Sequence, residues 1–204
     1  MAPYKLGITG SIAMGKTQTA TFFKEKGVPV WDADKTVHQL YQKEHMGYKA
    51  IKEISETLVN DNEVDRNEIL NRIKKDKKLL GKIEMRIHPL LKDERQKFIK
   101  SNQQKPLLVF DIPLLFETHI EKWFDGVLVV KANDEEQERR VLNRGIMSRD
   151  QFLQLKSKQM PIKTKCRLAT FIIDTDIGMS HAKKEVSKII ECIKGQKNEQ
   201  RSSI

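Results

Sequence analysis

The amino-acid sequence predicts an α/β fold in which a five-stranded parallel sheet is flanked by helices. Three observations support this prediction. Short apolar segments recur along the chain, longer helical patterns separate them, and a glycine-punctuated loop joins the first apolar segment to the first helical one. Strands that are apolar throughout and alternate with helices are typical of a parallel sheet covered on both faces. The length of 204 residues suits one compact domain with an appendage.

Five short segments have the length and composition of buried strands. Each consists mainly of apolar residues and ends on a glycine, an aspartate or a lysine. Apolar runs of this length, bounded by turn signals, are typical of strands that are buried on both faces. The segments are 5–10, 28–32, 107–111, 127–131 and 171–174.

Helical patterns fill the intervals between these strands. Gly27 stands where glycine commonly ends a helix, so it marks the end of the first one. Asp65, followed three residues later by Glu68, has the pattern of a capping box that opens another helix. Further helices are expected at 134–144, 148–159 and 179–194, in addition to the first at 16–26.

The basic charge of the chain is concentrated in one stretch. The formal net charge is +10, and nine basic residues but only one acid, Asp150, lie between 139 and 167. Such a segment is expected where a protein closes over a polyanion. The phosphates of a nucleotide and those of a nucleic acid both qualify, so charge alone leaves the two open.

The long interval 36–101 has no convincing strand, so we expect a helical, substrate-binding insertion there. The nucleotide-binding core then comprises 1–35 and 102–195, with the basic stretch at about 139–167 as a lid. The polar residues 196–204 are expected to form a disordered tail, because they have little apolar surface to bury.

The cysteines and the N-terminus indicate a cytoplasmic protein. Cys166 and Cys192 are far apart and form no CxxC pair, so neither a disulfide framework nor a zinc site is expected. No apolar run approaches the ~20 residues that a membrane-spanning helix needs. The chain enters its first strand without the apolar stretch of a signal peptide.

The loop after the first strand has the pattern of a phosphate-binding P-loop, or Walker A loop. Its sequence, Gly-Ser-Ile-Ala-Met-Gly-Lys-Thr, matches G-x-x-x-x-G-K-[ST] and lies between a strand and a helix, as the motif requires. In this motif the lysine reaches the β- and γ-phosphates and the hydroxyl binds Mg²⁺. We therefore expect ATP and Mg²⁺ as cofactors, with Thr17 on the metal. The residues expected to contact the nucleotide are Gly10, Ser11, Ile12, Ala13, Met14, Gly15, Lys16, Thr17 and Gln18.

Carboxylates follow two of the predicted strands. In an open parallel sheet the carboxyl ends of the strands face the ligand. Asp34, at the end of Asp32-Ala33-Asp34, could orient an acceptor hydroxyl, take its proton or hold magnesium; alternatively it is the N-cap of a helix at 35–41. Asp111 has the position of a Walker B carboxylate that holds the metal; alternatively it is a turn residue before Pro113.

Three arginines stand out within the basic stretch. Arg140 and Arg144 share one face of the predicted helix 134–144, and Arg149 follows shortly after. Like charges at this spacing mildly destabilise a helix unless an anion bridges them, which favours contact with phosphate. The alternative is an ordinary solvated basic surface.

Taken together, these segments resemble the dephospho-coenzyme A kinase family of P-loop kinases along nearly the whole chain. The P-loop is common to a large superfamily. Far more specific, in this order and at these separations, are Asp32-Ala33-Asp34, Asp65-Arg66, Ile87-His88-Pro89 and Pro113-Leu114-Leu115-Phe116-Glu117.

The resemblance implies an activity. Members of the family transfer the γ-phosphate of ATP to the ribose 3′-hydroxyl of dephospho-coenzyme A, the final step of coenzyme A biosynthesis. By this resemblance Asp34 is the general base, Lys16 stabilises the transferring group and Arg144 is the lid arginine. Arg140 and Arg149 are possible helpers.

The resemblance also implies residues on the substrate side. His88 and Pro89 are expected to shape that side within the helical insertion, although a core or helix-end histidine is the alternative for His88. Leu114, Glu117 and Arg149 are further expected substrate contacts. Neither nucleic acid nor a membrane is an expected partner, and a monomer is favoured with the oligomeric state left open.

This sequence departs from the family in two places. Glycine is usual at the positions of Ser11 and Ala13, and a methyl at 13 is expected only with a negative φ, since positive φ costs about 1 kcal/mol or more. The family often has Asp and Asn where this chain has Thr170 and Thr175. This region resembles the family's adenine-contacting end.

Other classes fit less well. P-loop kinases for nucleoside monophosphates, shikimate or gluconate share the loop but lack the His-Pro and Pro-Leu-Leu-Phe-Glu elements. A GTPase would need an Asn-Lys-x-Asp motif, which the sequence lacks. A nucleic-acid-binding ATPase is the alternative from another class, but the aromatic-rich strands of RNA-stacking platforms are absent from the sequence.

Overall fold

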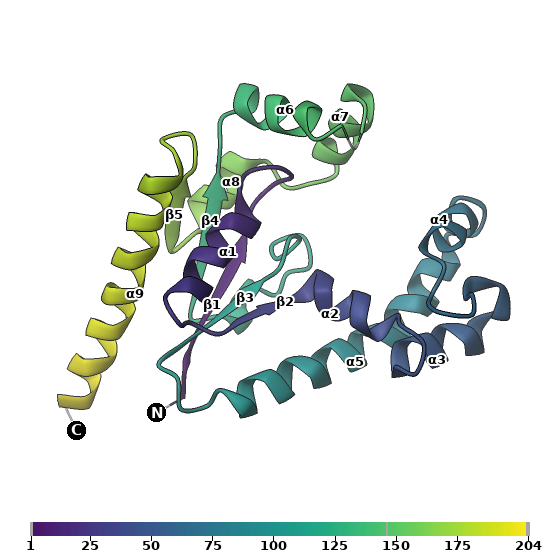
Figure 1. Ribbon diagram of the computed structural model, residues 1–204, viewed down its shortest axis with the longest axis horizontal. Coiled ribbons are helices and arrows are strands. Elements are labelled where there is room, and N and C mark those ends of the chain that lie inside the picture. The colour runs from purple at the N-terminus through teal and green to yellow at the C-terminus, as the bar shows by residue number, and fades with distance from the viewer. Residues whose placement is uncertain (1, 146, 203–204) are drawn as a thin grey trace. The chain divides into compact units, whose positions relative to one another are not determined.

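The computed structural model describes residues 2–145 and 147–202, with side chains to residue 196. Nine α-helices, five strands and two short 3₁₀ helices follow one another in these residues (Figure 1). In order they are β1 (Tyr4–Thr9), α1 (Lys16–Glu25), β2 (Val30–Asp32), α2 (Ala33–Leu40), α3 (Met46–Ile54), η1 (Glu56–Leu58), α4 (Arg66–Lys75), α5 (Lys78–Ser101), β3 (Leu107–Asp111), η2 (Glu121–Trp123), β4 (Gly126–Lys131), α6 (Asp134–Asn143), α7 (Arg149–Ser157), α8 (Ile162–Leu168), β5 (Phe171–Asp174) and α9 (Met179–Ser202).

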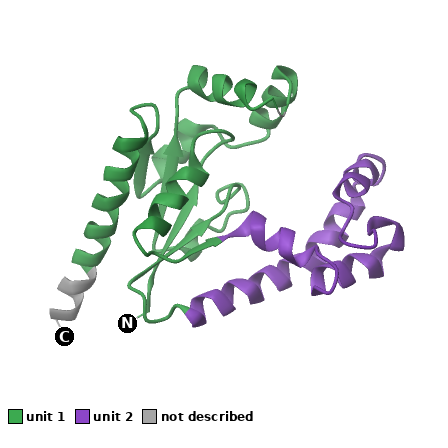
Figure 2. Cartoon of the chain, in the orientation of Figure 1, with its two compact units in different colours: residues 1–31, 102–204 green, residues 32–101 purple. Residues whose placement is uncertain are grey.

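The chain forms two compact units (Figure 2). One, the sheet unit, comprises residues 1–31 and 102–204, and the other, the helical unit, comprises residues 32–101. The helical unit begins at Asp32 rather than at residue 36. The reason is local: Asp32 caps α2, so the helix that opens this unit already includes Ala33.

The strands form the parallel five-stranded sheet that the sequence predicts. Their order is β2-β3-β1-β4-β5, and β1 pairs in parallel with β3 on one side and β4 on the other. β1 is therefore the central strand, with β3 and β2 on one side of it and β4 and β5 on the other, so the strand order reverses beside β1. In open α/β sheets this is where ligands bind.

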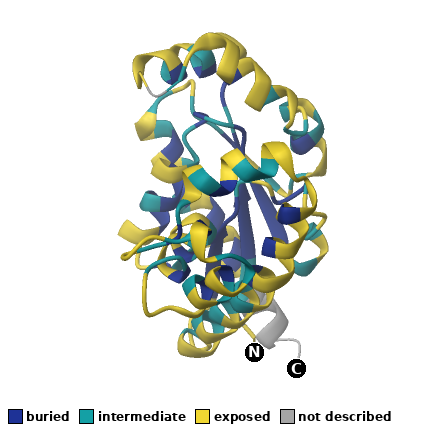
Figure 3. Cartoon of the chain, turned by 90° about the vertical axis from the view of Figure 1, so that its right-hand side faces the viewer, coloured by how far each residue is buried: buried dark blue, intermediate teal, exposed yellow. Residues whose placement is uncertain are grey.

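Burial on both faces explains the apolar composition of β3 and β4, whereas the edge strands β2 and β5 are only partly buried, contrary to the prediction. Every residue of β3 is buried, and so is β4 up to Val130 (dark blue in Figure 3). On one face Phe22 and Phe23 of α1 and Val186 of α9 belong to the same core cluster as the strands. Phe110 does not belong to this cluster, and because side chains alternate along a strand it faces the other side of the sheet, where its ring lies 5.1 Å from that of Trp123.

The helical unit has a core of its own. It consists of aliphatic side chains from α3, η1, α4 and α5. Asp65 accepts a hydrogen bond from the backbone N–H of Glu68 at 2.9 Å and so caps α4, at the position where the sequence predicts a helix to open. The buried members of the core are Ile51, Leu58, Val64, Ile69, Leu79, Ile83 and Ile87.

Two helices differ from the prediction. Helix α8 was not predicted; Pro161, with φ of −53°, precedes it and is preorganised for a helix start. The prediction of a disordered tail is wrong for residues 196–202, because α9 continues to Ser202. Residues 196–201 include good helix formers such as Gln, Lys, Glu and Arg, and no proline interrupts them. Residues 203 and 204 lie outside the described residues.

Over the stretches 2–145 and 147–202, no helix is both long and apolar enough to cross a membrane.

Candidate active site

The P-loop follows the central strand and lines a cavity of about 430 Å³. Both of its motif glycines are required by the geometry. A Cβ on Gly10 would lie 2.6 Å from the carbonyl oxygen of Val130, so the loop can pass β4 only without a side chain. Gly15 has a φ of 89° and precedes α1, a left-handed conformation that favours glycine.

Ala13 contradicts the prediction that its φ is negative, because its φ is 60°. The methyl group compensates for this conformation by its packing: it is 9% exposed and belongs to a small apolar cluster with Val141 of α6 and Phe152 of α7. Burying one methyl contributes about 0.8 kcal/mol, close to the roughly 1 kcal/mol that the left-handed conformation costs. Ser11, also buried, is not among the positive-φ residues.

We therefore predict opposite tolerances for two substitutions at this position. Ala13→Gly should change the free energy of unfolding by less than about 1 kcal/mol, because lost strain, lost packing and added chain entropy nearly cancel. Ala13→Val should lower it by about 2 kcal/mol or more, since a β-branched residue tolerates positive φ poorly and overfills the cluster. Urea unfolding of both variants measures this; a valine variant as stable as the glycine variant would contradict it.

Lys16 and Asp111, both predicted site residues, meet at the carboxyl end of the sheet. The Lys16 ammonium forms an ion pair with the Oδ1 atom of Asp111. Asp111 is 3% exposed and is the last residue of β3, so it is not a turn residue. Thr17 follows Lys16 in the first turn of α1 and is exposed.

Two glutamines, one on α6 and one after α7, form hydrogen bonds with the P-loop residue Ile12. Gln137, fully buried on α6, donates from Nε2 to the carbonyl oxygen of Ile12 at 2.8 Å. Oε1 of Gln159, after α7, accepts from the backbone N–H of Ile12 at 3.3 Å. Neither glutamine was predicted from the sequence. Only the i, i+4 spacing of Gln137 and Val141 could have placed Gln137 on the inner face of α6.

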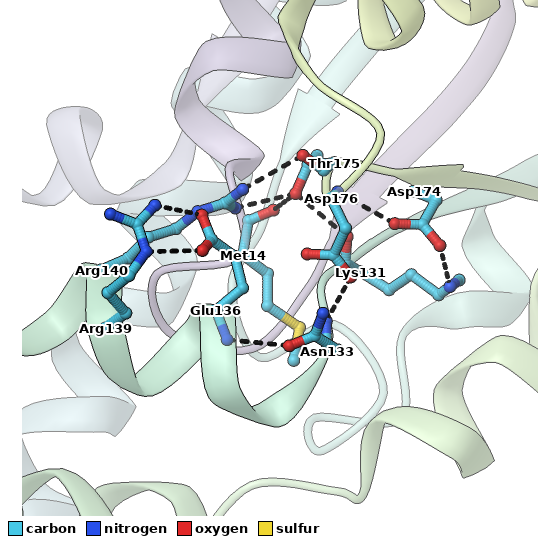
Figure 4. Close-up of polar contacts among 9 residues, drawn as sticks. All are labelled: Met14, Lys131, Asn133, Glu136, Arg139, Arg140, Asp174, Thr175 and Asp176. Carbon is cyan, nitrogen blue, oxygen red and sulfur yellow. Dashed lines mark hydrogen bonds and ion pairs between the residues drawn. The ribbon is translucent and has the colours of Figure 1, made fainter.

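Arg140 of α6 is held by acceptor groups of the protein itself (Figure 4). Its Nε donates to Glu136 at 2.7 Å, while Nη1 and Nη2 donate to the hydroxyl and carbonyl oxygens of Thr175 at 2.8 and 3.1 Å. Hydrogen bonds from Arg139 and Arg140 lower the pKa of Glu136 to about 2. The carboxylate of Glu136 on the same helix thus offsets the positive charge of Arg140.

A second, smaller cavity of about 270 Å³ adjoins the P-loop. Arg140, Thr175, Gly178 and Met179 line it, and Arg144, an exposed residue that caps the end of α6, lines both cavities. Of the two departures near the C-terminus, only Thr175 reaches this cavity. The hydroxyl of Thr170 instead accepts from the backbone N–H of Val127 at 3.1 Å, at the other end of β5.

Glu117, a predicted substrate contact, is engaged with the protein itself. It accepts from the backbone N–H of Met160 at 2.9 Å and forms an ion pair at 2.8 Å with Lys165 of α8, which is fully buried. Burial raises the pKa of the Glu117 carboxyl, but hydrogen bonds from Lys165 and Met160 outweigh it, so the pKa lies below its usual 4.5. Nothing in the pattern of basic residues had distinguished Lys165 from its neighbours.

Two other predicted substrate contacts lie near the surface of the sheet unit. Arg149 opens α7 and forms an ion pair with Glu138 of α6 at 2.6 Å. Leu114, in the segment after β3, is 44% exposed. Both are more exposed than Glu117, whose side chain is 18% exposed.

The remaining predicted residues belong to the helical unit. Asp34 is exposed in the first turn of α2 and is not its N-cap, because Asp32 accepts the capping hydrogen bond from Lys35 at 3.0 Å. His88 and Pro89 are exposed within α5, so His88 is neither a core nor a helix-end histidine. Pro89 leaves one backbone carbonyl of the preceding turn without its helical partner.

A P-loop after the central strand, a carboxylate paired with its lysine and a basic segment adjoining the loop together define the class of P-loop kinases. Comparison with known protein families identifies one family within this class. The family model described as dephospho-CoA kinase matches residues 4–181, and the chain therefore belongs to the dephospho-CoA kinase family.

Individual relatives agree with this assignment. The dephospho-CoA kinase of Ruegeria pomeroyi is 40% identical over 191 residues, which cover 94% of this chain and 96% of the relative. That of a Jannaschia species is 43% identical over 173 residues, covering 85% and 89%. Among solved structures, TT1252 from Thermus thermophilus matches with a TM-score of 0.82 and 28% identity, over 94% of this chain and 98% of that one.

Proposed function

We propose that the protein is a dephospho-CoA kinase, which transfers the γ-phosphate of ATP to the ribose 3′-hydroxyl of dephospho-coenzyme A. The observation that carries the proposal is the family match over residues 4–181, which includes the P-loop, the helical unit and the lid. The product is coenzyme A, so this is the final step of coenzyme A biosynthesis. Two cysteines without a disulfide fit the reducing cytoplasm, where we place the enzyme as a monomer.

ATP would occupy the two adjoining cavities of the sheet unit. The phosphates fit the larger cavity, because the backbone N–H groups of the loop and the N-terminus of α1 favour anions. The adenine fits the smaller one. The N–H groups of Arg140 that donate to Glu136 and Thr175 lie in the guanidinium plane, so its face is left for stacking on a planar base.

Thr17 and Asp111 are the residues that would hold Mg²⁺. A hydroxyl and a carboxylate are the hard oxygen donors that this ion prefers, and they lie at the end of β3 and the start of α1. When bound, Mg²⁺ neutralises charge on the β- and γ-phosphates. Asp111 also forms an ion pair with the ammonium of Lys16, the lysine of the P-loop.

Phosphoryl transfer depends mainly on position and charge, because its transition state is loose. The acceptor oxygen forms a bond to the γ-phosphorus as the bond to the leaving ADP oxygen breaks, and the acceptor's proton passes to Asp34. Lys16 and Arg144 offset the charge on the transferring group. His88, Pro89, Leu114 and Arg149 are proposed to contact the acceptor.

The test is to incubate the purified protein with ATP, Mg²⁺ and dephospho-coenzyme A, and to follow ADP release together with product mass. ADP formed in step with a product one phosphate heavier is the expected result. Turnover of shikimate, gluconate or a nucleoside monophosphate instead, with no coenzyme A formed, would retain the kinase class and overturn the substrate.

A further inference from the structure

Thr175 joins three segments of the sheet unit that are far apart in the sequence (Figure 4). Its backbone N–H donates to the carbonyl oxygen of Lys131, at the end of β4, at 3.0 Å. Its hydroxyl accepts from Nη1 of Arg140 at 2.8 Å and lies 3.1 Å from the carbonyl oxygens of both Met14 and Lys131. Its own carbonyl accepts from Nη2 of Arg140 at 3.1 Å.

The chemistry of a hydroxyl makes this arrangement directional. A threonine hydroxyl carries one proton and can accept through its lone pairs. Arg140 can only donate, so the hydroxyl must accept there, and its single proton is shared between the two carbonyls of Met14 and Lys131. A valine of the same shape would leave all three groups without this partner.

The methyl group of Thr175 contacts the P-loop as well. A Cβ built on Gly15 would lie 3.1 Å from Cγ2 of Thr175, so this methyl lies directly against the loop backbone. Thr175 therefore meets two successive loop residues, one through its hydroxyl at Met14 and one through its methyl at Gly15. Met14 and Gly15 immediately precede Lys16, so their position determines the position of the Lys16 backbone.

The segment after Thr175 is fixed by further polar contacts. Asp176 accepts from the backbone N–H of Asn133 at 2.7 Å, and its own N–H donates to Asp174 at 3.0 Å. Asp174 in turn forms an ion pair with Lys131. Thr175 is thus held from both sides, and its hydroxyl is presented to Arg140 and the loop at a defined place.

We propose that Thr175 is a positioning residue for the nucleotide. It orients the guanidinium plane of Arg140 and the Met14–Gly15 backbone together, so that the base and the phosphates of ATP are aligned by one side chain. Arg140 and Thr175 both line the smaller cavity, and Gly15 lines both cavities. The inference rests on the proposed function in taking the nucleotide to be ATP.

The test compares Thr175→Val, Thr175→Ser and a matched control, Thr170→Val. Thr170 lies at the opposite end of β5 from Thr175. Its hydroxyl accepts from the backbone N–H of Val127 on β4, and it lines neither cavity. Affinity for a non-hydrolysable ATP analogue is measured by calorimetry, and KM for each substrate by steady-state kinetics. Thermal unfolding shows that each variant is folded.

Thr175→Val is expected to weaken analogue binding and to raise KM for ATP by about tenfold, the scale of one hydrogen bond to a charged group. KM for dephospho-coenzyme A should stay within about twofold, which a general loss of structure would not produce. Thr175→Ser keeps the hydroxyl and should restore binding to within about threefold of the parent. Thr170→Val should bind the analogue as the parent does.

Several outcomes would overturn the proposal. They are unchanged analogue affinity in Thr175→Val, no recovery in Thr175→Ser, an equal effect of Thr170→Val, or equal increases in KM for both substrates. If Thr175→Val does not fold, Arg140→Met serves instead. Arg140→Met should then weaken analogue binding at least tenfold, about as strongly as predicted for valine, and unchanged affinity overturns the proposal.

The binding experiment needs no phosphate acceptor, so it is independent of the substrate assignment. If the parent forms no coenzyme A but the Thr175 series changes analogue affinity as expected, the proposed substrate fails and the positioning role stands. If coenzyme A forms normally while the Thr175 series shows no change in analogue affinity, the proposed substrate stands and the positioning role fails.

Discussion

Asp34→Asn is expected to lower kcat for coenzyme A formation by roughly 10²-fold or more, the usual scale for loss of a general base. A ribose hydroxyl is a poor nucleophile at neutral pH, and the amide cannot take its proton. The substitution should leave helix α2 in place, because Asp32 provides the N-cap. The free energy of unfolding should fall by less than about 1 kcal/mol, the scale of a carboxylate in a first helical turn.

Asp76→Asn is the matched control for this variant. It makes the same change in the same unit, and the asparagine side chain can still accept the hydrogen bond from the backbone N–H of Lys78 that Asp76 accepts at 2.9 Å. Its kcat should equal that of the parent. A kcat for Asp34→Asn within about threefold of the parent would mean that Asp34 is not the base.

Glu117→Gln is expected to lower the free energy of unfolding by about 3 kcal/mol at pH 7, because it leaves the charge of a buried lysine without its partner. Lys165 is fully buried and the Glu117 side chain is 18% exposed, so water screens this pair poorly. Urea unfolding measures the difference. We expect the substitution to affect the stability of the fold, because the ion pair joins α8 to the segment after β3.

The double variant Glu117→Gln/Lys165→Met is the control for this interpretation. Replacing a buried ion pair by neutral groups is often nearly neutral, so most of the lost stability should return. The glutamine oxygen can still accept from the backbone N–H of Met160, the hydrogen bond seen at 2.9 Å. A double variant as unstable as the single one would show that the lysine charge is not the cause.

The same pair predicts a pH dependence. The folded-state pKa of Glu117 lies below 4.5, its usual value. Its carboxylate therefore contributes stability above pH 4.5, and this contribution is lost as the pH falls through the folded-state pKa. The stability difference between the parent and Glu117→Gln should shrink on acidification below pH 4.5. A difference that stays constant would contradict the lowered pKa.

Local patterns predicted the sheet and the P-loop because both are encoded over a few neighbouring residues. The apolar run of β3 and the glycine spacing around Lys16 need no distant information. The start of α2 was harder to predict, because Asp32 and Asp34 are both suitable N-cap residues. The alternative interpretation of Asp34 as the N-cap was wrong, since Asp32 caps the helix. The helix at 179–194 was predicted, but its continuation to Ser202 was missed because the polar composition of the tail was taken to exclude a helix that good helix formers can continue.

Other parts of the site could not be predicted because their partners are distant in the sequence. The positive φ of Ala13 is acceptable only beside residues of α6 and α7. Gln137 and Thr175 act on the P-loop from more than a hundred residues away, and each is an unremarkable polar residue in its own segment. Glu117 resembled a substrate contact in its motif, whereas its partner Lys165 is buried in the lid region.

The packing of Ala13 against Val141 and Phe152 also has an evolutionary consequence. A descendant that acquires glycine at position 13 would release backbone strain but open a small void, which a larger side chain at position 141 could fill. Substitutions at these two positions should therefore accumulate in pairs along a lineage. The loop and the lid of this enzyme would then drift together, as a single inherited unit, rather than as independently exchangeable segments.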